Sequence, residues 1–174
     1  MFRTVAMARE IERKFLVTGD DWRPGVLGVP YRQGYLSAGA DAGCTVRARI
    51  AGERAWLTLK GPAAEGARDE YEYPIPVADA EEMLERLCAG GRIEKLRHRV
   101  PFAGRTWEVD EFTGENAPLV VAEVELDRID AEVTLPPWVG LEVTGDPRYT
   151  NAALARLPYS RWGKHSLAGE APAP

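Results

Sequence analysis

Charged and apolar residues alternate in short stretches along most of the chain. The clearest example lies near the N-terminus, where Glu10, Glu12 and Lys14 alternate with Ile11 and Phe15. Neighbouring residues of a β-strand point to opposite faces of a sheet, so this period of two predicts strands with one charged and one apolar face. Bounded by turn-prone Gly, Pro and Asp, such stretches predict eight strands. Their expected ranges are 9–17, 30–37, 44–51, 54–61, 69–77, 93–101, 105–112 and 119–127.

Two stretches depart from the strand period. In residues 77–88, apolar residues such as Leu84 recur at helical spacing, Asp79 offers an N-cap and a Gly-Gly pair follows. Residues 149–157 predict a second, shorter helix that Pro158 ends. The predicted fold class is therefore α+β, mainly β, with antiparallel strands and a few flanking helices.

Length and composition predict an ordinary globular protein. The chain has 174 residues, 45 % hydrophobic and 28 % charged, which predicts one domain with a sizeable core. No apolar run is long enough to span a membrane, and the N-terminus lacks the apolar stretch of a secretion signal. Cys44 and Cys88 have no zinc-binding spacing. We expect a cytoplasmic protein with no membrane partner and no disulfide. A homodimer remains open.

Charge along the chain argues against one class of partner. The formal net charge is −5, and acids and bases are interleaved. An extended nucleic-acid footprint needs a continuous excess of positive charge, so no nucleic-acid partner is expected. A compact anion held by a local basic cluster stays compatible with this sequence.

The charged strand faces admit two architectures. In the first, each charged face is simply solvated, which base rates favour for any single strand. In the second, the sheet closes into an eight-stranded antiparallel barrel with the charges in its lumen, and helices and longer loops cover the apolar outer face. The segments are sorted by sign, which favours the barrel. Burying so many charges is costly unless they bind ions, so a charged ligand and metals are expected.

The ordered set of charged motifs resembles the CYTH superfamily of triphosphate tunnel metalloenzymes. The opening Glu10-x-Glu12-x-Lys14 is similar to the ExExK motif of that family. The motifs that continue the resemblance, in the family's order, are Arg47-x-Arg49, Leu57-Thr58-Leu59-Lys60, Glu70-Tyr71-Glu72, Lys95-x-Arg97, Glu108-Val109-Asp110, Ala122-Glu123-Val124-Glu125-Leu126, Glu142-Val143-Thr144 and Asn151-x-x-Leu154-Ala155. The resemblance covers a single tunnel domain at 8–165, followed by a disordered tail at 166–174.

This resemblance implies a tunnel that binds a triphosphate-containing small molecule and divalent cations, Mg²⁺ or Mn²⁺, with two ions expected. Carboxylates suit such hard cations, and Lys and Arg suit phosphate oxygens. The predicted metal ligands are Glu10, Glu12, Asp110, Glu123 and Glu125. The predicted phosphate-binding residues are Lys14, Arg47, Arg49, Lys60, Lys95 and Arg97. Those expected to act most directly in catalysis are Glu12, Lys14, Arg49 and Lys95. The acids expected to orient the bases are Glu70, Glu72 and Glu108.

Several chemistries share these motifs. Hydrolysis of inorganic tripolyphosphate to pyrophosphate and phosphate, assisted by the metal ions, is the favoured activity because the short chain resembles the small bacterial members. Class IV adenylate cyclase, which converts ATP to cyclic AMP, and thiamine triphosphatase are the alternatives. A module that binds polyphosphate or a nucleotide without turnover is the alternative outside the enzymes.

A few residues carry expectations of position alone. His98 falls on the opposite phase from the neighbouring bases, so it is expected outside the lumen. Phe112 is expected to pack on the outer face, and Arg99 at the tunnel mouth. Arg161 and Lys164 follow the second helix, from where either could reach a phosphate.

Overall fold

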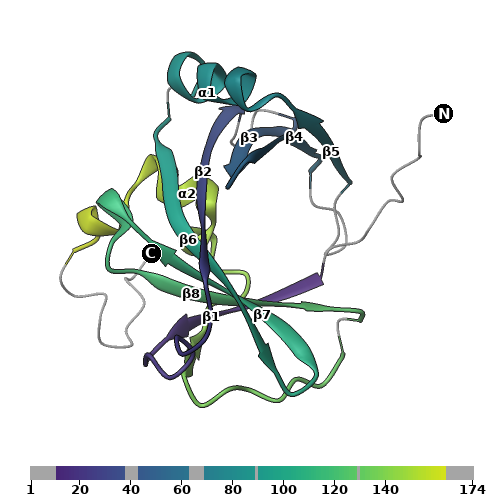
Figure 1. The fold of residues 1–174 in the computed structure, drawn as a ribbon, viewed down its shortest axis with the longest axis vertical. Coiled ribbons are helices and arrows are strands. Elements are labelled where there is room, and N and C mark those ends of the chain that lie inside the picture. Colours follow the sequence, from purple (N-terminus) through teal and green to yellow (C-terminus); the bar gives the residue numbers. More distant parts are fainter. Residues whose placement is uncertain (1–10, 38–42, 63–68, 89, 129, 164–174) are drawn as a thin grey trace.

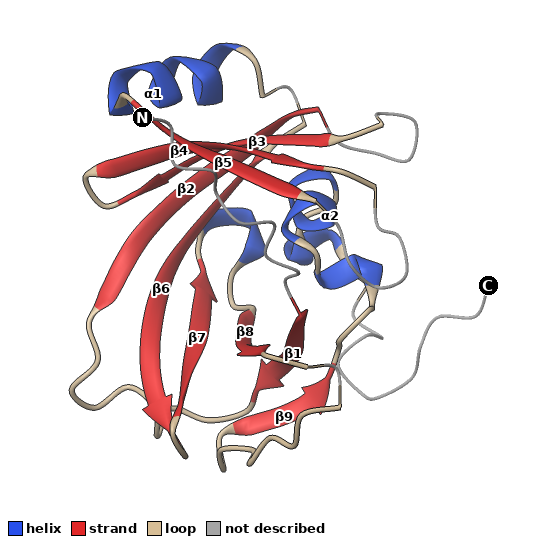
Figure 2. Cartoon of the chain, turned by 90° about the vertical axis from the view of Figure 1, so that its right-hand side faces the viewer, coloured by secondary structure: helices blue, strands red, loops and turns tan. Residues whose placement is uncertain are grey.

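The computed structural model contains one strongly curled antiparallel sheet with helices around it (Figures 1 and 2). It describes residues 11–37, 43–62, 69–88, 90–128 and 130–163. The nine strands of this part are β1 (Ile11–Val17), β2 (Gly28–Ser37), β3 (Thr45–Ala51), β4 (Arg54–Lys60), β5 (Glu70–Ile75), β6 (Arg92–Phe102), β7 (Arg105–Phe112), β8 (Val120–Leu126) and β9 (Val139–Glu142). The mainly β, antiparallel prediction is confirmed. The predicted domain limits at 8 and 165 and the tail at 166–174 lie outside the described residues.

The helices lie close to their predicted positions. The α-helices of the described part are α1 (Val77–Arg86) and α2 (Asn151–Arg156), and its 3-10 turns are η1 (Gly114–Asn116), η2 (Pro147–Tyr149) and η3 (Tyr159–Arg161). The predicted N-cap of α1 was wrong. Pro76 occupies that position with an extended backbone, and Asp79 lies within the first turn. Within the described ranges, neither α-helix is long and apolar enough to cross a membrane.

The prediction of a closed eight-stranded barrel was wrong in two respects: the sheet of the described residues has nine strands, and it is not closed. The strand order is β5-β4-β3-β2-β6-β7-β8-β1-β9, and in the described part β5 pairs with neither β1 nor β9. Figure 1 shows the curled sheet with its two ends apart. The unpredicted strand β9 pairs with the end of β1 through Phe15–Glu142 and Val17–Val139, and so occupies an edge that closure would need. The period of two identifies the faces of a strand but not its edge partners.

Most of the outer face of the sheet is apolar and covered, as predicted, but on β5 Tyr71 and Tyr73 are 46 % and 53 % exposed. Helix α1 packs Ala80 and Leu84 against β3 and β4 (Figure 2). Beneath β1, β6, β7 and β8, a larger core centres on Trp107, which is fully buried and in edge contact with Trp138. Trp22 and Trp138 come from the two long connections of this region. His98 lies on this outer side against the ring of Trp22, which confirms its predicted phase.

One end of the inner face is also apolar. Ile93, Phe112 and Val121 share the inward phase of the charged residues on β6, β7 and β8, and they pack against Leu154 of α2. The expectation that Phe112 packs on the outer face was therefore wrong. Each of these strands changes from charged to apolar along a single face, so α2 closes one end of the curl.

A glycine permits this closure. Gly91 has a φ of +93°, and a Cβ built there would lie 2.1 Å from the carbonyl oxygen of Ala155 in α2. Only glycine combines that backbone conformation with so close an approach. The docking of α2 against the start of β6 therefore depends on this position.

Candidate active site

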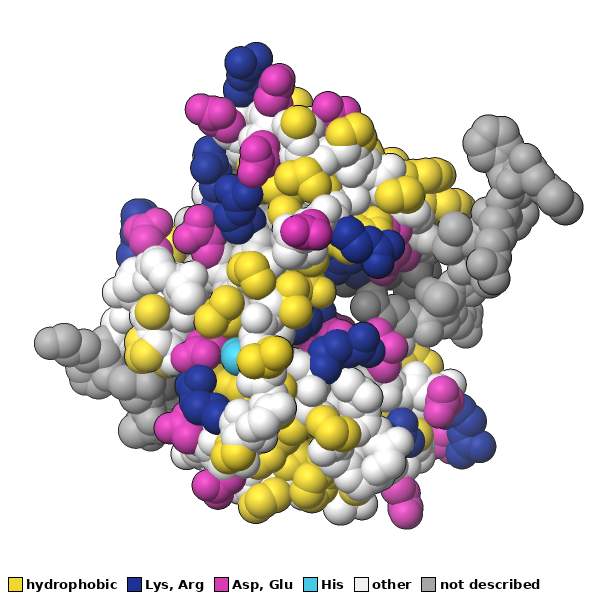
Figure 3. Space-filling view, viewed as in Figure 1, with side chains coloured by type: hydrophobic (Ala, Val, Ile, Leu, Met, Phe, Trp, Pro, Cys, Tyr) yellow, Lys and Arg dark blue, Asp and Glu magenta, His cyan; other side chains and the backbone are white. Residues whose placement is uncertain are grey.

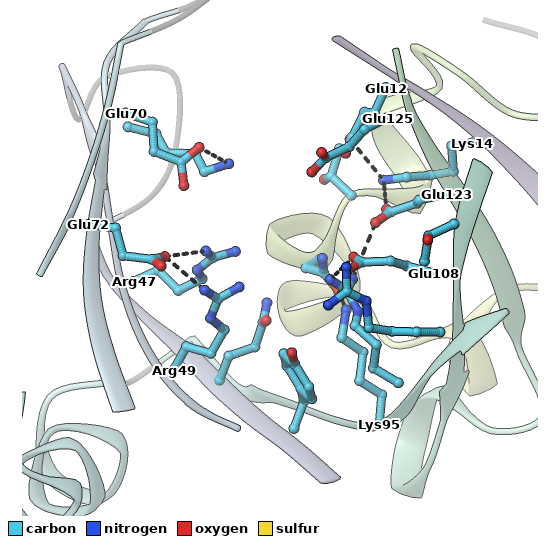
Figure 4. A pocket seen from close by; sticks show the side chains of 18 of the residues that line it. Glu12, Lys14, Arg47, Arg49, Glu70, Glu72, Lys95, Glu108, Glu123 and Glu125 are labelled. Atoms are coloured by element: carbon cyan, nitrogen blue, oxygen red, sulfur yellow. Dashed lines mark hydrogen bonds and ion pairs between the residues drawn. The ribbon is translucent and has the colours of Figure 1, made fainter. Parts of the chain in front are cut away.

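The inner faces of the strands enclose a cavity of about 750 Å³. In the space-filling view it opens as a hollow lined by basic and acidic side chains (Figure 3). Figure 4 shows two facing walls, one from β3 to β5 with Arg49 and Glu72, the other including Glu12 and Glu123. The predicted site residues that line the cavity are Glu12, Lys14, Arg47, Arg49, Lys60, Glu70, Glu72, Lys95, Arg97, Glu108, Glu123 and Glu125, and Arg99 lines it as well.

Two predicted residues are placed differently. Glu10 lies outside the described residues. Asp110 is on the inward face of β7, but it lies behind Lys95 and Arg97 and is only 1 % exposed, so it does not line the cavity.

Strand register brings the acids of β1 and β8 together. Glu12 lies opposite Glu125, and Lys14 lies opposite Glu123. Lys14 Nζ is 2.8 Å from Glu123 and 3.8 Å from Glu12. Burial works to lower the pKa of Lys14, but the charges of Glu123 and Glu12 outweigh it and the pKa is raised. Lys14 is therefore a fixed cation at neutral pH.

Lys95 and Arg97 of β6 and Asp110 of β7 form a buried triad of charged side chains. Lys95 Nζ donates to Asp110 Oδ2 at 2.5 Å, and Arg97 donates to both oxygens of the same carboxylate, Nε to Oδ1 at 2.6 Å and Nη2 to Oδ2 at 2.7 Å. Arg97 also donates to Glu108 through Nη1 and to Glu123 at 3.3 Å. Four contacts to three carboxylates thus hold one guanidinium, which fixes its plane.

Burial and charge have opposite effects on this triad. Complete burial lowers the pKa of Lys95 to about 8, although Asp110 acts in the other direction. Burial alone would raise the pKa of Asp110, but Lys95 and Arg97 outweigh it and lower the pKa to about 2. At neutral pH Lys95 and Arg97 therefore both remain charged despite their burial, and Asp110 remains a carboxylate.

The opposite wall carries bases on β3 and β4 and acids beside them on β5. Arg49 Nη2 donates to Glu72 at 2.8 Å, and Lys60 Nζ lies 2.8 Å from Glu70. Burial, with help from Arg47, lowers the pKa of Arg49. The Nε atoms of Arg47 and Arg49 are buried without a hydrogen-bond partner among the described residues. The wall carries three bases and two acids, and this excess of positive charge favours an anionic ligand.

The sequence reasoning missed the uncharged part of the lining and one base, Arg105. Tyr31, Gln33 and Tyr35 occupy alternate positions of β2 and face the cavity. Arg105 lines the cavity at the β6–β7 hairpin, and Asn151 of α2 accepts a hydrogen bond from Lys95 at 3.3 Å. The spacing of the three β2 residues was a usable signal, but uncharged side chains do not mark an inner face by themselves.

Two C-terminal expectations have separate outcomes. Arg161 donates to Glu115 at 2.9 Å and is 62 % exposed, and it does not line the cavity. The expectation that Arg161 reaches a phosphate is therefore not supported. Lys164 lies outside the described residues.

The acids of β1 and β8 suit a divalent cation. Glu12 and Glu125 carry like charges at directly opposed positions, an arrangement that a bound cation relieves. Glu123 lies two residues from Glu125 on the same face. Among the described residues, no three acids, histidines or cysteines already form a metal-binding group. The donors present thus fit a cation that also takes ligands from a bound anion or water.

Known proteins resemble this chain over most of its length. Residues 8–150 match a family described as CYTH domain. A protein named Inorganic triphosphatase from Acetivibrio thermocellus is 49 % identical over 156 residues, covering 90 % of this chain and 99 % of that protein. A protein of the same name from Nitrosomonas europaea is 44 % identical over 153 residues, covering 84 % of this chain and 96 % of that protein. A crystal structure described as an inorganic triphosphatase has a TM-score of 0.66 at 40 % identity, covering 86 % of this chain and 96 % of that one.

Proposed function

The chain belongs to the CYTH domain family, and from this premise we propose that it is a metal-dependent inorganic triphosphatase that hydrolyses tripolyphosphate to pyrophosphate and phosphate. The observation that carries the proposal is that two charged walls face each other across one cavity. The chain is also 49 % and 44 % identical to two proteins named Inorganic triphosphatase. The lining is mostly charged, which suits a compact polyanion better than a large organic group.

The bases of both walls are proposed to bind the phosphates. Arg47, Arg49 and Lys60 offer donors from one side, and Lys14, Lys95 and Arg97 from the other. Arginine binds phosphate oxygens through paired N–H groups, and lysine acts as a point charge. A polyphosphate bound between the walls would bring negative charge to these bases, which in the structure contact acidic side chains of the same wall.

The acids divide into two proposed roles. Glu12, Glu123 and Glu125 would hold Mg²⁺ or Mn²⁺, together with Glu10 as the family resemblance implies. When bound, such an ion neutralises phosphate charge and lowers the pKa of a bound water. The other role falls to Glu70, Glu72 and Glu108, each of which contacts a base of the cavity. These acids would orient the bases before the substrate binds.

Asp110 is proposed to position bases rather than to bind metal. Both of its oxygens already accept hydrogen bonds from Lys95 and Arg97, and its side chain is 2 % exposed. A carboxylate so engaged keeps the Lys95 ammonium and the Arg97 plane aimed into the cavity. This departs from the metal role that the family resemblance implied.

The test is phosphate release from tripolyphosphate, ATP and thiamine triphosphate, each with Mg²⁺ or Mn²⁺ and with EDTA as the control. The expected result is metal-dependent release that is fastest from tripolyphosphate. Cyclic AMP formed from ATP would instead identify a cyclase, and faster release from thiamine triphosphate would identify a thiamine triphosphatase. Tight binding of tripolyphosphate without release would identify a binding module.

A further inference from the structure

Five side chains from four neighbouring strands form an alternating array of cations and aromatic rings, which we call the cation–aromatic array. Arg54 lies 4.9 Å from the ring centroid of Trp56, and Arg49 lies 5.3 Å from the same ring. Arg49 is also 5.9 Å from the ring centroid of Tyr31, and Arg97 is 5.2 Å from it. All four separations are within the range of a cation–π contact.

Tyr31 is the link between the two walls in this array. It lies on β2, which pairs with β3 on one side and with β6 on the other. Its ring therefore stands between Arg49 of the first wall and Arg97 of the second, and its side chain lines the cavity. Both arginines are bases that the proposed function assigns to phosphate binding.

The two arginines differ in how firmly carboxylates hold them. Arg97 contacts Asp110, Glu108 and Glu123. For Arg49 the carboxylate hydrogen bond of the described part is the one to Glu72, and Arg49 Nε is buried without a partner there. The orientation of Arg49 should therefore depend more on its aromatic neighbours than that of Arg97 does.

Repulsion between the bases increases this dependence. Burial lowers the pKa of Arg49 most, and the charges of Arg47 and, less strongly, Arg97 act in the same direction, so Arg49 lies among like charges that Glu72 offsets only in part. A ring presents its negative face to a cation, and two rings on either side of a guanidinium restrict its plane. Tyr31 and Trp56 flank Arg49 in this way.

We propose that Tyr31 is a positioning residue, whose ring face holds the Arg49 guanidinium at a set separation from Arg97 and thereby fixes the span of positive charge offered to the phosphate chain. This inference rests on the proposed triphosphatase function, because it assigns the array to substrate binding. The tyrosine hydroxyl has no part in it. The ligand class that the array favours is an unsubstituted polyphosphate that reaches both walls at once.

The test compares Tyr31→Leu, which removes the ring, with Tyr31→Phe, which keeps it. Tripolyphosphate binding is measured by calorimetry in EDTA, where no metal-dependent hydrolysis consumes the ligand, and turnover is measured separately with Mg²⁺. We expect Tyr31→Leu to bind about tenfold more weakly and Tyr31→Phe to stay within about twofold of wild type. The matched control is Tyr73→Leu, the same change at a tyrosine that is 53 % exposed outside the cavity.

A second comparison separates positioning from a general structural effect. In an Arg49→Ala background, Tyr31→Leu should change the affinity by less than about twofold, because the base it positions is gone. Trp56→Leu, which removes the other ring beside Arg49, should reproduce the loss and serves if Tyr31→Leu fails to fold. Thermal unfolding checks that each variant is folded.

Three results would overturn the inference. They are wild-type affinity in the folded Tyr31→Leu and Trp56→Leu variants, an equal loss in Tyr31→Phe, and a loss in the Arg49→Ala background as large as in wild type. The proposed function fails separately, if the wild-type protein binds tripolyphosphate but releases no phosphate with metal. In that event the comparison in EDTA still decides the role of Tyr31.

Discussion

Replacing Asp110 by asparagine removes one buried charge from beneath the cavity and keeps the side-chain shape. The carboxylate accepts hydrogen bonds from Lys95 and Arg97, and the Asp110 and Lys95 side chains are 2 % and 1 % exposed. The amide of the variant carries no charge to balance either cation. Lys95 then remains buried without its counter-ion, which is the costly outcome for an ion pair.

The size of the effect follows from the pKa of Asp110. Its two cations outweigh burial and lower that pKa from 3.8 to about 2. A difference of about 2 pKa units corresponds to about 2–3 kcal/mol at neutral pH. With the buried ammonium left unpaired, we expect Asp110→Asn to lower the free energy of unfolding by about 3 kcal/mol and Tm by about 6–12 °C.

The pH dependence has a definite sign. Because the pKa of Asp110 is lower in the folded protein than in the unfolded chain, its stabilising contribution is complete above pH 4 and is lost as the pH falls toward 2. Asp110→Asn should lack this part of the acid dependence. The measurement is urea unfolding of both proteins at a series of pH values between 7 and 2.

An exposed aspartate provides the control. Asp130 accepts two hydrogen bonds from Arg128 at 2.9 Å, but its side chain is 68 % exposed, so Asp130→Asn should change stability by less than about 0.5 kcal/mol. If Asp110→Asn proves as stable as this control, or keeps the wild-type acid dependence, the reasoning about the buried triad is refuted.

Three further predictions use other parts of the site and core. The pKa of Lys95 is about 8, so kcat/KM for tripolyphosphate should fall as the pH rises above 8 and Lys95 loses its proton. If a Lys95→Arg variant shows the same fall, Lys95 is not the titrating group. Glu125→Gln should raise the Mg²⁺ concentration for half-maximal activity at least about tenfold; an unchanged metal titration would remove it from the ligands. Trp107→Ala should cost about 3–5 kcal/mol by urea unfolding, whereas a cost below about 1 kcal/mol would contradict its core role.

Side-chain direction was the most predictable property of this site. It is a local property, since a residue two positions away in a strand points to the same face. Arg47 and Arg49 face the cavity and Ala48 between them is fully buried under α1, as the alternation predicted. The same rule placed the acids of β1 and β8 in the cavity.

Edge pairing and inner apolar contacts were less predictable. Whether β5 meets β1 depends on the twist and curl of the whole sheet, and no short pattern encodes that. Strand β9 has four residues, too few for a period to emerge. Phe112 was placed on the wrong face because charge was used as the mark of the interior, although its phase, two residues after Asp110, gave the right answer.

The cavity wall and the hydrophobic core are opposite faces of the same strands. In β1, Glu12 and Lys14 line the cavity while Phe15 packs in the core with Trp107. Inserting or deleting one residue within β1 would reverse both faces beyond that point, burying charge and placing an aromatic ring in the cavity. A change of length within such a strand should therefore disturb the cavity and the core together, so activity and folding are lost at the same time. Tolerated insertions and deletions in this protein should be confined to the connections between strands.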